Sequence, residues 1–168
     1  MARNKFSLSN YKLTTCNIGE LVPVNWFEVL PGDGIEQFTQ GLIRCAPLNA
    51  PPMHPVAVRF HHFYVRNRLL WDDSGGSETD FEAFITGGTD GNKTPTHPYI
   101  DLNATSVTQG TLMNYLGIPA QDYTGTGVQI SALPFRAYAA IYNNFYRDQD
   151  ICTELTIDTS DGADSTTN

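Results

Sequence analysis

Basic residues are scarce in this sequence. Only 10 Lys and Arg stand against 18 Asp and Glu, which gives a formal net charge of −8. A surface with this balance repels a polyanion, so we do not expect the chain as a whole to hold nucleic acid by neutralising phosphates. The charge is uneven, however, because Arg59, Arg66 and Arg68 lie close together while acidic residues gather at 158–168. A local basic surface is therefore still compatible with the sequence.

Cysteines and long apolar runs are scarce as well. Cys16, Cys45 and Cys152 are odd in number, widely spaced and outside any C-x-x-C pattern, which fits a reducing compartment better than a disulfide scaffold. No stretch approaches the roughly 18 apolar residues that a membrane span needs. The first residues also lack the apolar centre of a signal peptide. We therefore expect a chain made in a cytoplasm, with no membrane partner.

The histidines form no pattern typical of a metal site. His61 and His62 are neighbours on a predicted strand, so their side chains should point to opposite faces. His54 and His97 lie in stretches rich in proline. Because no His-x-x-x-His or Cys/His spacing occurs, we expect structural or interface histidines and no metal ligands.

Carboxylates and nucleophile motifs give no better candidate. Asp72 with Asp73, and Asp148 with Asp150, can be read as pairs, but adjacent acids at the end of a strand are more often solvated or capping. No Gly-x-Ser-x-Gly nucleophile motif is present, and the Gly-Thr-Gly run at 125–127 is too short for a phosphate loop. We expect no catalytic, cofactor-binding or metal-binding residue, and hence no enzyme.

Turn-forming and aromatic residues, by contrast, are plentiful, with 14 Gly, 10 Pro and 11% aromatic side chains. Three stretches are predicted to be β-strands: 20–30, with apolar residues on both faces; 56–71, dense in β-branched and aromatic residues; and 35–46, which is weaker and more polar. A Pro-Gly-Asp-Gly turn at 31–34 would join the first two as a hairpin. Prolines at 47–55 would keep the connection to the third stretch extended or looped.

The strongest helical pattern covers 133–149. Four aromatic rings recur there at three- and four-residue steps: Phe135, Tyr138, Tyr142 and Phe145. Polar side chains such as Arg136 and Asn143 fall on the opposite side, and Pro134 suits the first turn. We expect a core helix whose rings pack under a broad apolar cover.

Weaker signals predict the remaining elements. Short helices are expected at 78–86 and 109–116, ended by Gly87 and Gly117 respectively. A brief strand-like run covers 151–157, and 89–106 reads as a loop. Strands precede a long irregular region with helices and no βαβ alternation, so the predicted fold class is mainly β with helical insertions.

The predicted organisation has an arm, a domain and a tail. Residues 1–19 form an extended N-terminal arm without a core of its own, and 158–168 form a disordered acidic tail. Between them, 20–157 form one domain, with an insertion at about 72–132 and the central helix at about 133–149.

Four colinear segments carry a family resemblance. They are NYKLTTCNIGELVPVN at 10–25, EVLPGD at 28–33, the stretch 44–73 that contains APPMH and ends in NRLLWDD, and LPFRAYAAIYNNFYRDQ at 133–149. Together they resemble the major capsid proteins of the microviruses (Microviridae), small single-stranded DNA bacteriophages, and most closely those of the gokushovirus branch. The resemblance extends over most of residues 5–150.

The resemblance implies a fold, a function and partners. The fold is a viral jelly-roll β-sandwich, so that 20–157 would be a partial jelly-roll domain. The function is that of a structural capsid protein in a T=1 icosahedral virion, assembled in the bacterial host cytoplasm. Its partners are other capsid subunits and other virion proteins, with non-specific single-stranded DNA contact inside the shell through Arg-rich or aromatic patches.

Length is the departure from the family. Its members are much longer, and their remaining jelly-roll strands follow the central helix. We therefore expect this chain to correspond to the amino-terminal portion, with an incomplete jelly roll whose open edges favour association. Among the variable insertions of the family, residues 90–106 are the candidate for a receptor-binding surface.

Two alternatives of other classes are weighed against the capsid reading. A β-sandwich module that binds carbohydrate or another ligand should show an exposed aromatic platform or a metal loop. A jelly-roll-type metalloenzyme should place two or three histidines on adjacent strands around one cavity, which the histidine positions argue against. The four colinear segments favour the capsid protein.

Overall fold

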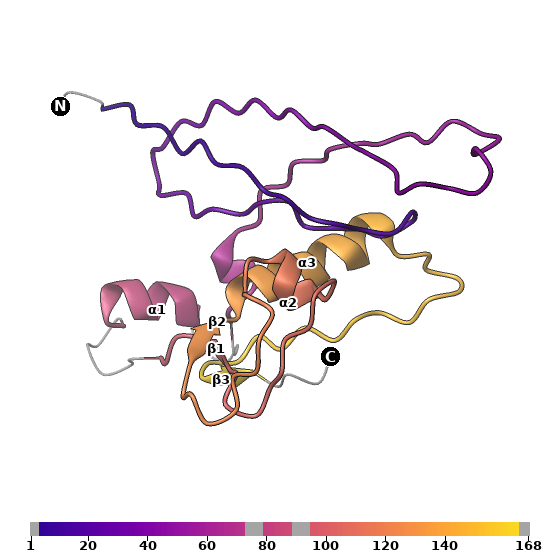
Figure 1. Cartoon of the computed structure of the whole chain (residues 1–168). Helices are drawn as coiled ribbons and strands as arrows, with labels where there is room; N and C mark the ends of the chain where they lie inside the picture. The colour runs from indigo at the N-terminus through magenta and orange to yellow at the C-terminus, as the bar shows by residue number, and fades with distance from the viewer. Residues whose placement is uncertain (1–3, 73–78, 89–94, 165–168) are drawn as a thin grey trace. The chain divides into compact units, whose positions relative to one another are not determined.

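The computed structural model describes residues 4–72, 79–88 and 95–164 (Figure 1). The chain forms two compact units: Met1–Phe27 together with Val65–Asn168, and Glu28–Tyr64. All helices and strands of the described residues belong to the first, larger unit. None of these helices is long and apolar enough to cross a membrane.

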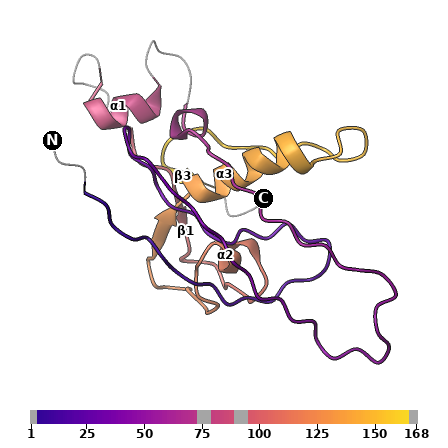
Figure 2. The ribbon, with the colours of Figure 1, turned by 90° about the horizontal axis from the view of Figure 1, so that it is seen from above.

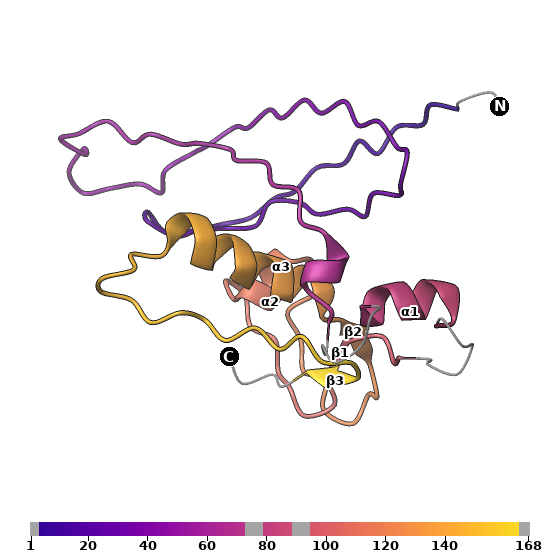
Figure 3. The same ribbon diagram turned by 180° about the vertical axis from the view of Figure 1, so that it is seen from behind.

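A small mixed sheet lies in the larger unit (Figure 3). Its central strand β1 (Tyr99–Asp101) pairs antiparallel with β2 (Gln129–Ser131), so that Ile100 lies opposite Ile130. On its other edge β1 pairs in parallel with β3 (Ala163–Asp164). The described residues thus form a three-stranded sheet accompanied by helices, and they do not close a β-sandwich.

Two apolar clusters form the core of this unit. The first consists of Ile100, Leu102, Val107, Tyr123 and Ala132, and the second of Leu70, Trp71 and Leu133. Helix α3 (Leu133–Ile141) contributes to both, because Leu133 belongs to the second while Phe135 packs against the first. Since each fully buried large apolar side chain stabilises a fold by roughly 1.5–3 kcal/mol, these clusters hold α3 against the sheet.

The two predicted short helices are present. Helix α1 (Asp80–Thr86) begins with a capping box, in which the Thr79 hydroxyl accepts the amide of Glu82 and the Glu82 carboxylate accepts the amide of Thr79. It ends at Gly87, whose φ of 82° is readily adopted only by glycine. Helix α2 (Leu112–Tyr115) is shorter than the predicted 109–116, because the extended backbone of Thr111 caps it and starts it at Leu112.

The central helix is present with different bounds and a different buried face. Pro134 stands in the first turn of α3, as predicted, and α3 continues into the π-helical turn η2 (Tyr142–Tyr146). The helix ends before 149 because Arg147 takes an extended backbone. The expected ring stripe is only partly covered, since Phe145 is 67% exposed while Asn143 is buried. A π-turn changes the rotation per residue, which alters the face that later residues present.

The predicted strands at 20–30, 35–46 and 56–71 are not strands in the structure, and neither is 151–157. The first three run as an irregular chain, with only the 3₁₀ turn η1 (Asn67–Leu69) at the end (Figures 1 and 2). A strand exists only when a neighbour completes its backbone hydrogen bonds. Within the described part of the chain, no segment pairs with these stretches in a ladder.

The acidic tail and the predicted loop at 89–106 also differ from expectation. Residues 158–164 are not disordered, because β3 pairs with β1 and the amide of Thr96 donates to the Asp161 carboxylate over 3.0 Å. Residues 165–168 lie outside the described residues. The supposed loop supplies β1 and the buried Leu102, so its later part is core. Its residues 89–94 are likewise outside the described ranges.

Candidate functional site

The histidines lie in both units. His54, His61 and His62 belong to Glu28–Tyr64, whereas His97 belongs to the larger unit. The His97 ring meets Trp71 edge-on at 5.4 Å between centroids, which is an aromatic packing contact. Among the residues that the structure describes, no group of three His, Cys, Asp or Glu side chains is placed to hold a metal ion.

The predicted acid pairs have structural contacts. The amide of Asp72 donates to the carbonyl of Thr159 over 3.0 Å, and Asp73 lies outside the described residues. The Asp148 carboxylate accepts the amide of Asp150 over 3.0 Å, which stabilises a turn. Neither contact resembles a pair of carboxylates facing a common substrate.

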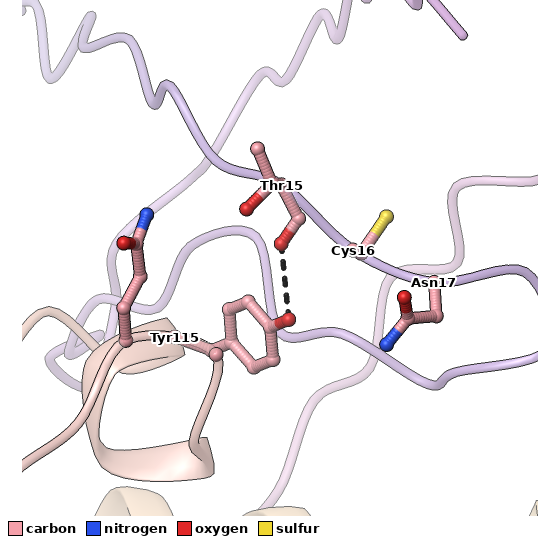
Figure 4. A pocket seen from close by; sticks show the side chains of 6 residues that line it. Thr15, Cys16, Asn17 and Tyr115 are labelled. Atoms are coloured by element: carbon pink, nitrogen blue, oxygen red, sulfur yellow. Dashed lines mark hydrogen bonds between the residues drawn. The ribbon is translucent and has the colours of Figure 1, made fainter. Parts of the chain in front are cut away.

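The N-terminal arm is fixed to α2 by hydrogen bonds in a shallow polar pocket (Figure 4). The Tyr115 hydroxyl donates to the carbonyl of Thr15 over 3.0 Å and lies 3.4 Å from the Glu20 carboxylate. The Asn17 side chain donates to the same carboxylate over 2.7 Å. Cys16 and Asn17 line the pocket beside Tyr115. These contacts hold the arm against α2.

Further hydrogen bonds continue this attachment along the arm. The Tyr138 hydroxyl of α3 donates to the carbonyl of Leu21 over 2.8 Å, and the Trp26 indole N–H donates to that of Leu116 over 3.0 Å. The ammonium group of Lys12 donates to the carbonyls of Pro23 and Tyr115 at the end of α2, where a cation is favoured. The arm therefore lies on the helices of its own unit.

The electrostatics of the arm pocket follow from these contacts. Hydrogen bonds from Asn17 hold the pKa of Glu20 below its ordinary value. Burial raises the pKa of the Tyr115 hydroxyl, and the negative charge of Glu20 adds to the rise. Burial also lowers the pKa of Lys12. At neutral pH the protonated tyrosine therefore faces an ionised carboxylate, which is the arrangement that supports their hydrogen bond.

Arg136 is the centre of the best-enclosed polar cluster. Its guanidinium pairs with both oxygens of Asp164, and it donates to the carbonyls of Leu70 over 2.8 Å and of Ser160 over 2.7 Å. Asn143, on the same helical run, exchanges two hydrogen bonds with the backbone of Leu155. Since these buried groups have partners within the chain, they hold the tail in place and offer no vacant ligand site.

The segment Glu28–Tyr64, by contrast, leaves large apolar side chains in solvent. The exposed ones are Val29, Leu30, Ile35, Phe38, Leu42, Ile43, Leu48, Met53, Val56, Val58, Phe60, Phe63 and Tyr64. Extended apolar surface of this kind marks an interaction site. Inside this unit the Phe60 ring lies over Gly41, where an added Cβ would come within 2.8 Å of the ring. The exposed segment is therefore the candidate functional surface.

The sequence predicted parts of these sites and missed others. It indicated the apolar character of 56–71, whereas it described 35–46 as a weaker and more polar strand. It placed Arg136 and Asn143 on the side opposite the rings without indicating that both are buried. Their partners Asp164 and Leu155 are remote in sequence, and no local pattern marks such pairs. The candidate receptor segment 90–106 supplies a core strand over the part that the structure describes.

Comparison with known proteins gives a consistent set of relatives. The family model described as "Capsid protein (F protein)" matches residues 1–168. Capsid protein VP1 of Bdellovibrio phage phiMH2K is 32% identical over 97% of this chain and 29% of its own length. Capsid protein VP1 of Chlamydia phage 1 is 32% identical over 95% of this chain and 26% of its own length. Capsid protein VP1 of Spiroplasma virus 4 is 30% identical over 97% of this chain and 29% of its own length.

Proposed function

Because this chain belongs to the capsid protein (F protein) family, we propose that it forms part of the shell of a small single-stranded DNA phage, in a structural and not a catalytic role. The chain spans 26 to 29% of the length of the relatives described above. In those relatives the rest of the capsid protein lies outside the matched region. We therefore propose that this chain acts together with that remaining part in a whole capsid subunit. The observation that carries the proposal within the molecule is the exposed apolar surface of Glu28–Tyr64.

We propose that this surface is the unfinished part of a jelly roll. The stretches 20–30, 35–46 and 56–71 combine β-branched and aromatic residues typical of strands with backbones that take part in no ladder among the described residues. Additional strands would complete their hydrogen bonds and cover their apolar side chains. A second polypeptide, or further sequence of the same subunit, would supply those strands.

Completed subunits would then associate with one another and with other virion proteins. We propose that this shell is a T=1 icosahedron around single-stranded DNA, assembled in the cytoplasm of the bacterial host. In a closed symmetric shell every copy buries the same surface patch. Modest contacts per subunit are therefore enough to stabilise the whole shell. The acidic net charge of −8 suits a shell whose wall does not bind the genome over its whole surface.

A pair of substitutions tests the role of the exposed surface. The chain is mixed with a polypeptide carrying the part of the phiMH2K capsid protein that it does not match, and particles are counted by electron microscopy. Phe38→Ser with Leu42→Ser should abolish particles, because both side chains are about 90% exposed here and would be covered on completion. Urea unfolding of the chain alone should not change.

Ile151→Ser is the matched control, because Ile151 is also highly exposed, at 83%, but lies in the larger unit. It should leave the particle count unchanged. An equal loss of particles from the control, or none from the Phe38 and Leu42 pair, would contradict the assignment of the subunit-completing surface to Glu28–Tyr64.

A further inference from the structure

The N-terminal segment consists of a fixed base and a tip without remote contacts. The arm base, residues 12–26, makes the hydrogen bonds to α2 and α3 that begin with Lys12. Among the described residues, the arm tip, residues 4–11, has only local hydrogen bonds between Ser7 and Ser9. Eight extended residues reach roughly 26–29 Å. The arm tip is therefore a tethered segment that is long enough to meet another molecule.

The arm tip combines positive charge with exposed apolar side chains. Residues 1–19 contain three Lys and Arg but no Asp or Glu, a formal charge of +3 in a protein whose total is −8. Phe6 is 82% exposed and follows directly on the exposed Lys5. Leu8, two positions further, is 60% exposed, and positions two apart lie on the same side of an extended chain. Such a tip fits a surface that is both apolar and acidic.

A shallow hollow with these properties lies in the C-terminal part of the same unit. Its volume is about 350 Å³, and it is lined by Glu154, Leu155, Thr156 and Ile157. Leu155 is held in place by its two backbone hydrogen bonds with Asn143, so one wall of the hollow is fixed. Glu154 is exposed and has no hydrogen-bond or ion-pair partner for its carboxylate within the described part of the chain. The hollow thus joins apolar walls to a carboxylate without a partner.

The arm tip and the hollow are complementary in charge and in size. Residues 148–158 contain four Asp and Glu and no Lys or Arg, opposite in sign to the arm. A volume of about 350 Å³ lies at the lower end of the range for small-ligand sites, roughly 300–1,000 Å³, which suits a single aromatic ring. The tip of the same copy does not fill the hollow, because Phe6 is left largely in solvent.

We propose that the arm tip of one copy docks into this hollow on a second copy. The Phe6 ring then lies against Leu155 and Ile157, and the Lys5 ammonium group lies beside Glu154. This inference rests on the proposed association of capsid subunits and identifies one contact between them. The polypeptide that completes the subunit is the competing partner. The charges favour a second copy, because every copy carries both a basic tip and an acidic hollow, and such head-to-tail contacts close into rings.

Nuclear magnetic resonance of the full chain tests the contact through the amide signal of Leu155. This signal should shift as the chain concentration rises, which gives a dissociation constant. Phe6→Ser should weaken the association by roughly 10- to 100-fold, because burial of a Phe side chain contributes about that factor. Leu13→Ser is the matched control, since Leu13 is 89% exposed but belongs to the arm base, and it should leave the constant unchanged within about two-fold.

Charge reversal tests whether the contact joins two copies. Lys5→Glu and Glu154→Lys should each weaken the association by roughly 2- to 10-fold, because like charges then meet. An equal mixture of these two variants should restore it, since each tip then finds a hollow of opposite charge on the other variant. Glu36→Lys reverses an exposed charge in Glu28–Tyr64 and should have no effect.

Three results would overturn the proposal. The first is a Leu155 signal that does not depend on concentration, and the second is a mixture that associates no more tightly than the separate charge variants. The third is a shift that appears only after the remaining part of the phiMH2K capsid protein is added, which would assign the arm tip to that polypeptide. Equal weakening by Leu13→Ser or Glu36→Lys would likewise exclude a specific contact.

These outcomes are separable from those of the capsid proposal. Particles that form from chains whose Leu155 signal never shifts would refute only the contact between tip and hollow. Chains that associate through Phe6 and Glu154 but never enter a particle would refute the capsid role and leave this contact in place.

Discussion

Arg136 and Asp164 form a buried ion pair between α3 and the edge strand β3, with side chains only 3% and 10% exposed. The same guanidinium donates to the carbonyls of Leu70 and Ser160, so four acceptor atoms surround it. One arginine therefore connects the helix, the second core cluster and the C-terminal segment. The pairing explains why residues 158–164 are held against the sheet despite their polar composition.

Removal of Arg136 tests this connection. Arg136→Leu should lower the free energy of unfolding by about 3–5 kcal/mol, because it leaves the carboxylate of Asp164 buried without its partner. Urea unfolding at neutral pH measures the loss. Arg68→Gln is the control, since its pair with Glu82 is 3.9 Å apart with side chains 49% and 46% exposed, and it should cost at most about 1 kcal/mol. Similar losses for both variants would contradict the account.

Asn143 holds the returning chain at Leu155. Asn143→Ala should destabilise the protein by roughly 1–3 kcal/mol, because the amide side chain exchanges two hydrogen bonds with the Leu155 backbone in a buried setting. Hydrogen exchange should show faster exchange of the Leu155 amide. Asn144→Ala removes an exposed amide from the next position and should leave that rate unchanged. An unaltered Leu155 rate in Asn143→Ala would refute the role.

The arm pocket should be sensitive to acid. Asn17 holds the pKa of Glu20 below its ordinary value of 4.5, so the Glu20 contribution to arm attachment is present above pH 4.5 and is lost as the pH falls through the lower folded value. The amide NMR signal of Asn17 should shift over that range, since this amide donates to the carboxylate. Glu20→Gln should abolish the shift. A pH-independent Asn17 signal in the unaltered chain would contradict the pocket.

The capping box at α1 gives a local prediction. Thr79→Ala should cost about 0.5–2 kcal/mol, because the hydroxyl accepts the amide of Glu82 at the helix start. The change is measured by urea unfolding. Thr108→Ala, at an exposed position outside any helix, should change stability by less than about 0.5 kcal/mol. Equal effects of the two substitutions would show that the cap contributes nothing.

Local signals in the sequence predicted the local features of the fold. Three helices could be predicted from the glycine at 87, the proline at 134 and the periodic apolar residues. Such signals are local, because helix caps and turns depend on neighbours within a few positions. The helix limits were less accurate where a π-helical turn follows α3, since no residue type signals that change of winding.

Features that depend on distant residues were not predictable. β3 pairs with β1 across more than sixty positions, and its two residues carry no strand pattern of their own. Conversely, 35–46 and 56–71 have strand-like sequences, but the described chain gives them no ladder partner. The burial of Arg136 follows from Asp164, whose position near the sheet is itself a result of folding. Side-chain periodicity alone would place such a residue outward.

The most direct test of the capsid account is the mass of the particles in solution, measured by light scattering for the chain alone and with the remaining part of the phiMH2K capsid protein. The account predicts small or heterogeneous species from the chain alone and a particle of about sixty copies after the second polypeptide is added. A stable, folded monomer under both conditions would contradict it.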